Sequence, residues 1–83
     1  MEEKRTALIG IIIEDMESVE KLNGLLHEYR NAIIGRMGVP RPESGLSLIS
    51  IALEADNNTI SALSGKLGAL PGVQAKTIYA KNR

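Results

Sequence analysis

The chain contains no cysteine, no phenylalanine and no tryptophan, and its aromatic residues are two tyrosines. Without cysteine it can form no disulfide, no thiolate metal site and no thiol nucleophile. Without a set of aromatic side chains it lacks the stacking platforms on which nucleobases bind. The core must therefore be aliphatic, and any stabilisation beyond that core has to come from assembly or from a bound ligand.

Net charge and long apolar runs are absent as well. Ten basic and ten acidic residues cancel, and the basic residues form no long patch, so direct binding of nucleic acid is not expected. No apolar run approaches the roughly 20 residues needed to cross a bilayer. Residues 1–5 lack the basic-then-apolar form of a signal peptide. We therefore expect no membrane partner and a cytoplasmic location.

A pattern of apolar residues and glycine occurs twice, with an offset of 41 positions. The matching residues are Val19, Leu22, Gly24 and Leu26 in the first copy, and Ile60, Leu63, Gly65 and Leu67 in the second. In each copy an apolar, β-rich run precedes this helix-like pattern and another follows it. The chain of 83 residues therefore indicates two β-α-β units within a single domain, residues 1–83, near the lower end of the size of self-supporting domains.

The predicted elements follow in the order strand, helix, strand, strand, helix, strand. We expect strands at residues 6–13, 31–39, 46–53 and 73–80, helices at residues 16–29 and from about residue 57 to 70, and a hairpin loop at residues 40–45. This order predicts an α+β, ferredoxin-like βαββαβ sandwich, an antiparallel four-stranded sheet with two helices on one face. The two most apolar strands, the first and the third, belong in the middle of that sheet.

The third predicted strand is apolar on both of its faces. Because side chains alternate across a strand, Leu46, Leu48 and Ala52 point one way, and Ile49, Ile51 and Leu53 point the other. Two helices can cover only one face, and each aliphatic side chain is worth roughly 1.5 to 3 kcal/mol when fully buried. We expect the chain to assemble with itself through the sheet, as a homodimer or tetramer, by face packing or edge pairing. Tolerated exposure of some β-branched surface is the alternative.

His27 is the single histidine of the chain. It follows Leu26 and so lies beside the apolar stripe of the first predicted helix, where a partly exposed side chain is expected. A lone histidine without cysteine offers no usual metal-ligand spacing, so we predict no metal site. Two interpretations stay open, a solvated or interface histidine and a histidine that contacts a small ligand.

The most unusual local sequence is Gly35-Arg36-Met37-Gly38, followed by Pro40. Paired glycines in a strand favour an edge strand with a bulge. They also allow close backbone approach or room for a small molecule beside the positive charge of Arg36.

Gly24 and Gly65 occupy matching positions inside the two predicted helices. Glycine costs roughly 1 kcal/mol relative to alanine at such positions. The pair indicates either close approach of a neighbouring subunit or ligand, or glycine tolerated at the surface.

No arrangement of residues indicates catalysis. The acidic residues near the predicted helix starts are accounted for by capping and by the helix dipole. No serine-histidine-acid order and no close acid pair stand out, so a nucleophile and a convincing base are both missing. We predict a protein that is not an enzyme and has no catalytic residues, and the sequence identifies no cofactor.

Several short motifs resemble those of a known family. They lie at residues 27–29, 33–40, 49–50, 65–68 and 70–73, and Gly35-Arg36-Met37-Gly38 is the distinctive one. Over residues 5–81 the chain resembles a family of regulators associated with iron-only hydrogenase systems. That family is itself similar to ACT domains and to the C-terminal domain of nickel-responsive repressors.

The resemblance implies an oligomeric, ACT-like module that binds something small and acts by regulation, with transcriptional control of an iron-only hydrogenase system as the candidate process. We predict the ligand-binding residues to be His27, Arg36, Met37 and Gly38, at a subunit interface. The chain has no cysteine, one histidine and no ribbon-helix-helix segment. Nickel binding and direct contact with DNA are therefore not expected, and DNA would have to be reached through a regulatory protein partner.

Two other functions fit the same residues. One is a small ferredoxin-like enzyme with an interface active site, in which Arg36 clamps an anion and His27 acts as acid or base. The other is a structural partner for a hydrogenase maturation or transcription factor. We rank the regulatory module first, because it accounts for both the two-sided apolar strand and the resemblance.

Overall fold

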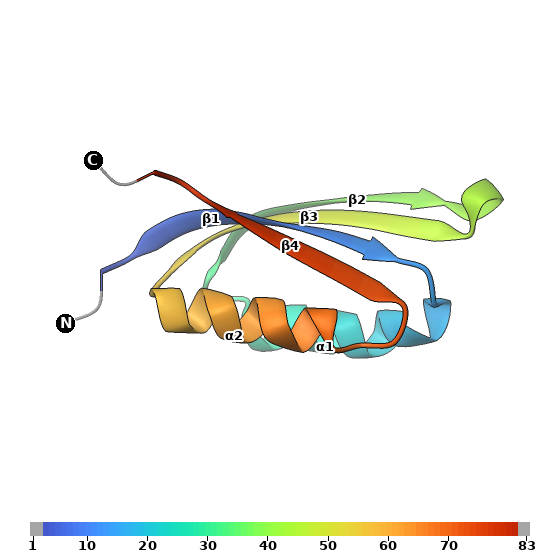
Figure 1. Cartoon of the computed structure of the whole chain (residues 1–83), viewed down its shortest axis with the longest axis horizontal. Helices are drawn as coiled ribbons and strands as arrows, with labels where there is room; N and C mark the ends of the chain where they lie inside the picture. Colours follow the sequence, from blue (N-terminus) through green and yellow to red (C-terminus); the bar gives the residue numbers. More distant parts are fainter. Residues whose placement is uncertain (1–2, 82–83) are drawn as a thin grey trace.

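The structure is a computed structural model and describes residues 3–81. A four-stranded antiparallel sheet lies on a layer of two α-helices, in the order β1, α1, β2, β3, α2, β4 (Figure 1). The strands are β1 (Arg5–Ile13), β2 (Ile33–Arg41), β3 (Leu46–Ala55) and β4 (Val73–Tyr79), and the helices are α1 (Val19–Glu28) and α2 (Asn57–Gly68). Two 3₁₀ turns, η1 (Met16–Ser18) and η2 (Pro42–Ser44), complete the chain path. The predicted ferredoxin-like fold is confirmed.

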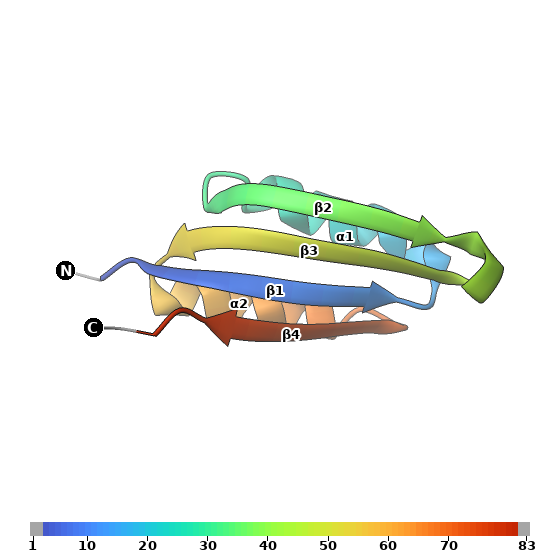
Figure 2. The same ribbon diagram turned by 90° about the horizontal axis from the view of Figure 1, so that it is seen from above.

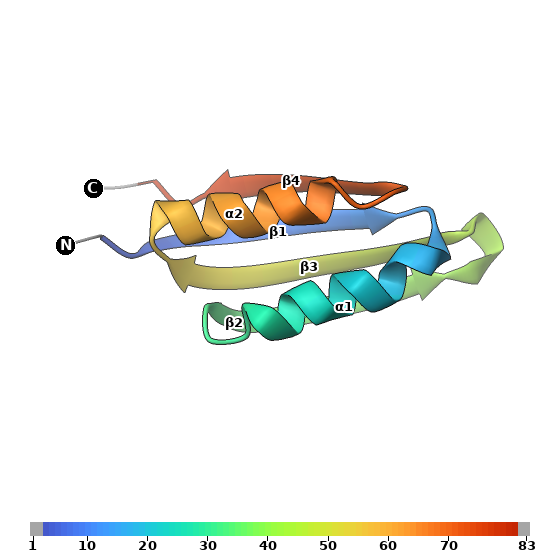
Figure 3. The ribbon, with the colours of Figure 1, turned by 90° about the horizontal axis from the view of Figure 1, so that it is seen from below.

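The strand order in the sheet is β2-β3-β1-β4, with every neighbouring pair antiparallel (Figure 2). The two most apolar strands, β1 and β3, lie in the middle, as predicted. Both helices lie on one face of the sheet, with α2 beneath β1 and β4 and α1 beneath β3 and β2 (Figure 3). In residues 3–81 no helix covers the other face. Within residues 3–81, no helix has the length and apolar character needed to cross a membrane.

The core lies between the sheet and the helices. Its fully buried side chains come from one face of the central strands and from the apolar stripes of both helices. They are Ile9, Ile11 and Ile13 of β1, Ile51 and Leu53 of β3, Leu22 and Leu26 of α1, and Ile60, Leu63 and Leu67 of α2. All are aliphatic, as the absence of phenylalanine and tryptophan requires.

Aspartate side chains cap the starts of the helical segments. The Asp15 carboxylate accepts a hydrogen bond from the backbone N–H of Glu17 at 2.9 Å, and the Asp56 carboxylate accepts one from that of Thr59 at 3.2 Å. The first predicted helix, residues 16–29, is divided into η1 and a shorter α1. The Ser18 hydroxyl between them donates to the Pro71 carbonyl at 2.6 Å, which fixes the start of α1 against the turn before β4.

Strand β2 departs most from its predicted bounds. It begins at Ile33 and continues past Pro40 to Arg41, so the prediction that it ends at Pro40 is wrong. Proline is tolerated there because β2 is an edge strand, and one side of its backbone needs no ladder partner. The register with β3 shifts between Ile33 and Gly35, and this irregularity confirms the bulge predicted for an edge strand.

Three glycines differ in what surrounds them. A Cβ added at Gly24 or Gly65 would meet nothing within 4 Å, so no contact inside the described chain requires glycine in either helix. Gly72 has a φ of +67°, and a Cβ there would lie 2.6 Å from Cβ and 2.9 Å from N of Asp15. The Gly72 carbonyl also accepts a hydrogen bond from the backbone N–H of Glu14 at 2.7 Å. The turn before β4 therefore needs glycine.

We expect Gly72→Ala to lower the free energy of unfolding by about 2 to 5 kcal/mol. The left-handed φ costs an L-residue roughly 1 to 2 kcal/mol, and overlap with Asp15 adds about 1 to 3 kcal/mol. Gly65→Ala is the matched control and should raise stability by up to about 1 kcal/mol, because alanine favours a helix. Urea unfolding followed by circular dichroism measures both. Similar values for the two variants would contradict the close approach to Asp15.

Candidate ligand-binding groove

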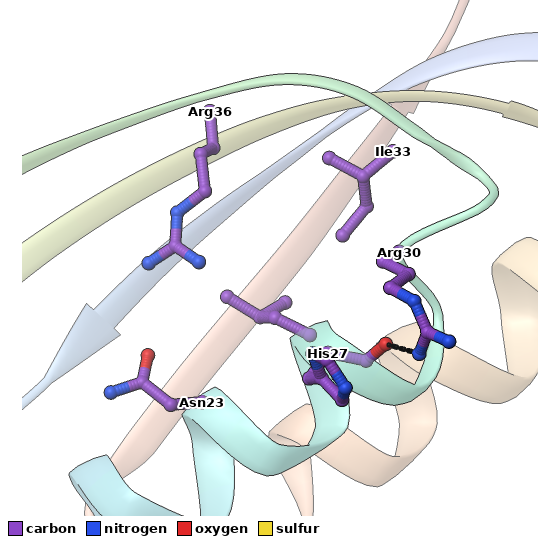
Figure 4. A pocket seen from close by; sticks show the side chains of 6 residues that line it. Asn23, His27, Arg30, Ile33 and Arg36 are labelled. Atoms are coloured by element: carbon purple, nitrogen blue, oxygen red, sulfur yellow. Dashed lines mark hydrogen bonds between the residues drawn. The ribbon is translucent and has the colours of Figure 1, made fainter.

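A groove of about 350 Å³ lies between helix α1 and the edge strand β2 (Figure 4). It is lined by Asn23, Leu26 and His27 of α1, Arg30 of the following turn, and Ile33 and Arg36 of β2. The spacing of the three helical residues, three and four apart, places them on one side of α1. The groove thus forms where the chain leaves α1, turns, and enters β2.

Arg36 lies on the helix-facing side of β2. In the ladder it is paired with Ile51 of β3, whose side chain is fully buried on that side. Paired residues of antiparallel strands share a face. Where the central strands carry isoleucine and leucine, β2 therefore carries a guanidinium, which points toward α1 in Figure 4.

The groove is positively charged and no carboxylate lines it. Among residues 3–81, the ion pairs involve neither Arg36 nor Arg30. Glu28, which follows the groove residue His27, instead lies 3.9 Å from the Nζ of Lys66 on α2. Two permanent positive charges, those of Arg30 and Arg36, therefore line one groove on a chain whose net charge is zero.

Arg30 is oriented by a local hydrogen bond. Its Nη1 donates to the backbone carbonyl of His27 at 2.9 Å, drawn as a dashed line in Figure 4. A guanidinium has five N–H donors, so most of its donors stay available to a ligand. The His27 imidazole, exposed on α1, adds a further polar group to the same groove. Among the residues that the structure describes, no three of His, Asp or Glu lie together as a metal site.

The four predicted ligand-binding residues do not all lie at one place. His27 and Arg36 line the same groove. Met37 lies on the opposite face of the sheet, because side chains alternate along a strand, and it is 62% exposed there. Gly38 returns to the helix-facing side, paired with Ile49, but it does not line the groove.

Asn23 and Arg30 line the groove but are not among the residues that the sequence predicts for a site. The sequence does indicate Asn23 as a neighbour of His27, because it precedes His27 by four residues and so shares its helix face. Arg30 has none, because it lies in the turn between α1 and β2, where helical or strand periodicity gives no direction.

Residues 5–77 match the family model described as "TM1266-like: Iron-only hydrogenase system regulator, putative". The chain belongs to this TM1266-like family. The structure of the uncharacterized protein TM1266 from Thermotoga maritima superimposes on it with a TM-score of 0.91 at 39% sequence identity. The match covers 95% of this chain and 100% of that chain. The family predicted from the sequence motifs is therefore confirmed.

More distant structures share the fold of this TM1266-like protein. The ACT domain from GTP pyrophosphokinase of Chlorobium tepidum matches with a TM-score of 0.69 at 17% identity, over 96% of this chain and 90% of that one. A formyltetrahydrofolate deformylase from Pseudomonas putida KT2440 matches with a TM-score of 0.67 at 14% identity, over 94% of this chain and 30% of that one. These likenesses confirm an ACT-like fold. Among curated proteins no match is found.

We expect Arg36→Met to change the free energy of unfolding by no more than about 0.5 kcal/mol, because Arg36 has no ion-pair partner among residues 3–81 and methionine can replace its aliphatic stem. Ile51→Ala, at the paired position of β3, is the comparison and should cost about 2 to 5 kcal/mol. Denaturant unfolding of both variants gives the two values. A loss above about 2 kcal/mol for Arg36→Met would mean that the guanidinium is structural.

Proposed function

We propose that this TM1266-like protein is a regulatory module that binds a small ligand, has no catalytic activity of its own, and works as a homo-oligomer in the cytoplasm. Regulation of an iron-only hydrogenase system is the role that its family description names. Our proposal places that regulation at transcription, through a partner protein that contacts DNA.

The observation that carries the proposal is the sheet face opposite the helices, which we call the open face (Figure 2). Its large apolar side chains are Leu8 and Ile12 of β1, Met37 and Val39 of β2, Leu48 of β3 and Ile78 of β4. Each is between 36% and 68% exposed. Contiguous exposed apolar surface of this kind marks an interaction site in soluble proteins.

The strand register arranges the open face in three rows that run across the sheet. One outer row is Gly35, Ala52, Leu8 and Ile78, and the other is Val39, Leu48, Ile12 and Gln74. The middle row is Met37, Ser50, Gly10 and Lys76. Serine and glycine occupy the centre of the middle row, and a shallow hollow there reaches Ile12 and Leu48 of one outer row.

The apolar side chains of the two outer rows favour a second copy of the chain as the occupant. A two-fold axis in the plane between two copies would bury the same rows on both, an isologous contact. Each large side chain buried in this way contributes roughly 1.5 to 3 kcal/mol. A chain of 83 residues without disulfides gains stability from such burial.

Strand β2 provides a physical link between ligand and assembly. Arg36 faces the groove, while its neighbour Met37 lies on the open face. A ligand that binds Arg36 more tightly in one assembly state than in another would raise the population of that state. Strand β2 would carry this effect from the groove to the open face. The groove also offers no hydroxyl or thiol nucleophile and no carboxylate base, which favours binding over catalysis.

We expect the wild-type chain to self-associate at micromolar concentration and Leu8→Glu to dissociate it. Loss of one buried leucine from each copy removes about 3 to 6 kcal/mol, which weakens a dimer by roughly 10² to 10⁴-fold. Met16→Glu is the matched control, because Met16 is 50% exposed against 48% for Leu8 but lies on η1, outside the sheet. Sedimentation equilibrium measures all three. A monomeric wild type, or equal dissociation by Met16→Glu, would remove the basis of the proposal.

Retained ligand and subunit number can be measured together. Native mass spectrometry of protein purified from its own host should show an even number of subunits, with an added small-molecule mass that denaturation releases. An unliganded monomer in that spectrum would oppose the proposal.

A further inference from the structure

The two arginines of the groove stand apart from each other. In Figure 4, Arg36 and Arg30 lie on either side of Ile33, one from β2 and the other from the turn after α1. Asn23 lies on the Arg36 side and adds an amide that can donate or accept a hydrogen bond. The groove therefore has a cationic group near each end.

Between these ends the lining is aliphatic. Leu26 is 2% exposed and belongs to the core, so the apolar surface left to a ligand comes from Ile33, which is half-buried and packs against the same core. A bare inorganic anion would leave this surface without a partner. An aliphatic segment between two acidic groups would cover it and gain apolar burial.

Size and charge both limit the ligand. A volume of about 350 Å³ lies near the lower end of the roughly 300 to 1,000 Å³ found for small-molecule sites. The groove also follows the C-terminal part of α1, because two of its three helical residues, Leu26 and His27, fall in the last turn of Val19–Glu28. The negative end of a helix dipole does not favour a phosphate, which binds best at helix N-termini. Carboxylates, with less charge per group and a planar match to guanidinium, suit these positions better.

We infer that the groove between α1 and β2 binds a small aliphatic dicarboxylate, with one carboxylate on Arg36 and the other on Arg30. The inference rests on the proposed ligand-sensing function and names the ligand class for its site. The groove lies on the helix side of the sheet, away from the open face, so an assembly through the open face leaves it accessible. Binding and assembly can therefore be tested separately.

The test is a titration of the ¹⁵N-labelled full chain in phosphate-free, low-salt buffer with glutarate, succinate, acetate and inorganic phosphate. We expect the dicarboxylates to shift amide signals of residues 23–36 and to bind about tenfold or more tightly than acetate, since each charge-assisted contact adds a factor of that order. Added salt should weaken this binding. Phosphate carries its charge at one centre and has no aliphatic segment, so equal binding of phosphate would overturn the inference.

Three variants locate the contacts. Arg36→Met and Arg30→Met should each reduce dicarboxylate affinity to about that of acetate. Arg41→Met is the matched control, because Arg41 lies on the same strand but outside the groove and pairs with Glu43 at 3.8 Å. Its affinity should equal that of the wild type. Unchanged binding in the two groove variants, or an equal loss in Arg41→Met, would refute the assignment.

Sedimentation of the same variants separates this inference from the proposed function. Both groove variants should keep the wild-type subunit number, and Leu8→Glu should still bind dicarboxylate after it dissociates. Absence of dicarboxylate binding in an oligomeric wild type would overturn the ligand assignment alone. Dicarboxylate binding by a monomeric wild type would support the ligand assignment and refute the proposed homo-oligomer.

Discussion

The covering of one sheet by two helices is the constraint on which this structure depends. The inward face of β1 and β3 is filled with isoleucine and leucine and closes against α1 and α2. The same strands carry Leu8, Ile12 and Leu48 on the other side, where no helix lies. The folded chain therefore buries one apolar face and presents a second, and the proposed assembly rests on this second face.

The edge strand β2 is covered less completely than the centre of the sheet. Ile33 is its side chain that packs against the core, and the ladder is interrupted directly after it. Arg36 then occupies a place that an aliphatic residue fills on the neighbouring strand. The proposed function uses this guanidinium for binding, and binding sites commonly depart from the residue pattern best suited to folding.

The repeated apolar pattern was sufficient to predict most of the fold. Leu22, Leu26, Ile60, Leu63 and Leu67 are all buried where their helical spacing places them. The boundaries were less accurate where competing local signals exist. Proline favours a strand end, but Pro40 is tolerated within β2 because β2 is a sheet edge. Residues 16–18 are helical only as a 3₁₀ turn, since Asp15 caps them separately.

For the candidate site, the sequence by itself determined which residue types were available, a single histidine and an arginine between two glycines, and it determined the family through its motifs. Tertiary structure decided which of them meet. Alternation along β2 sends Arg36 to the groove and Met37 to the open face, and the bulge before Gly35 sets that alternation. Arg30 joins His27 only because the turn after α1 folds back against the helix end. Local periodicity fixes the direction of a side chain within one element, whereas the meeting of side chains from a helix, a turn and a strand depends on how those elements pack.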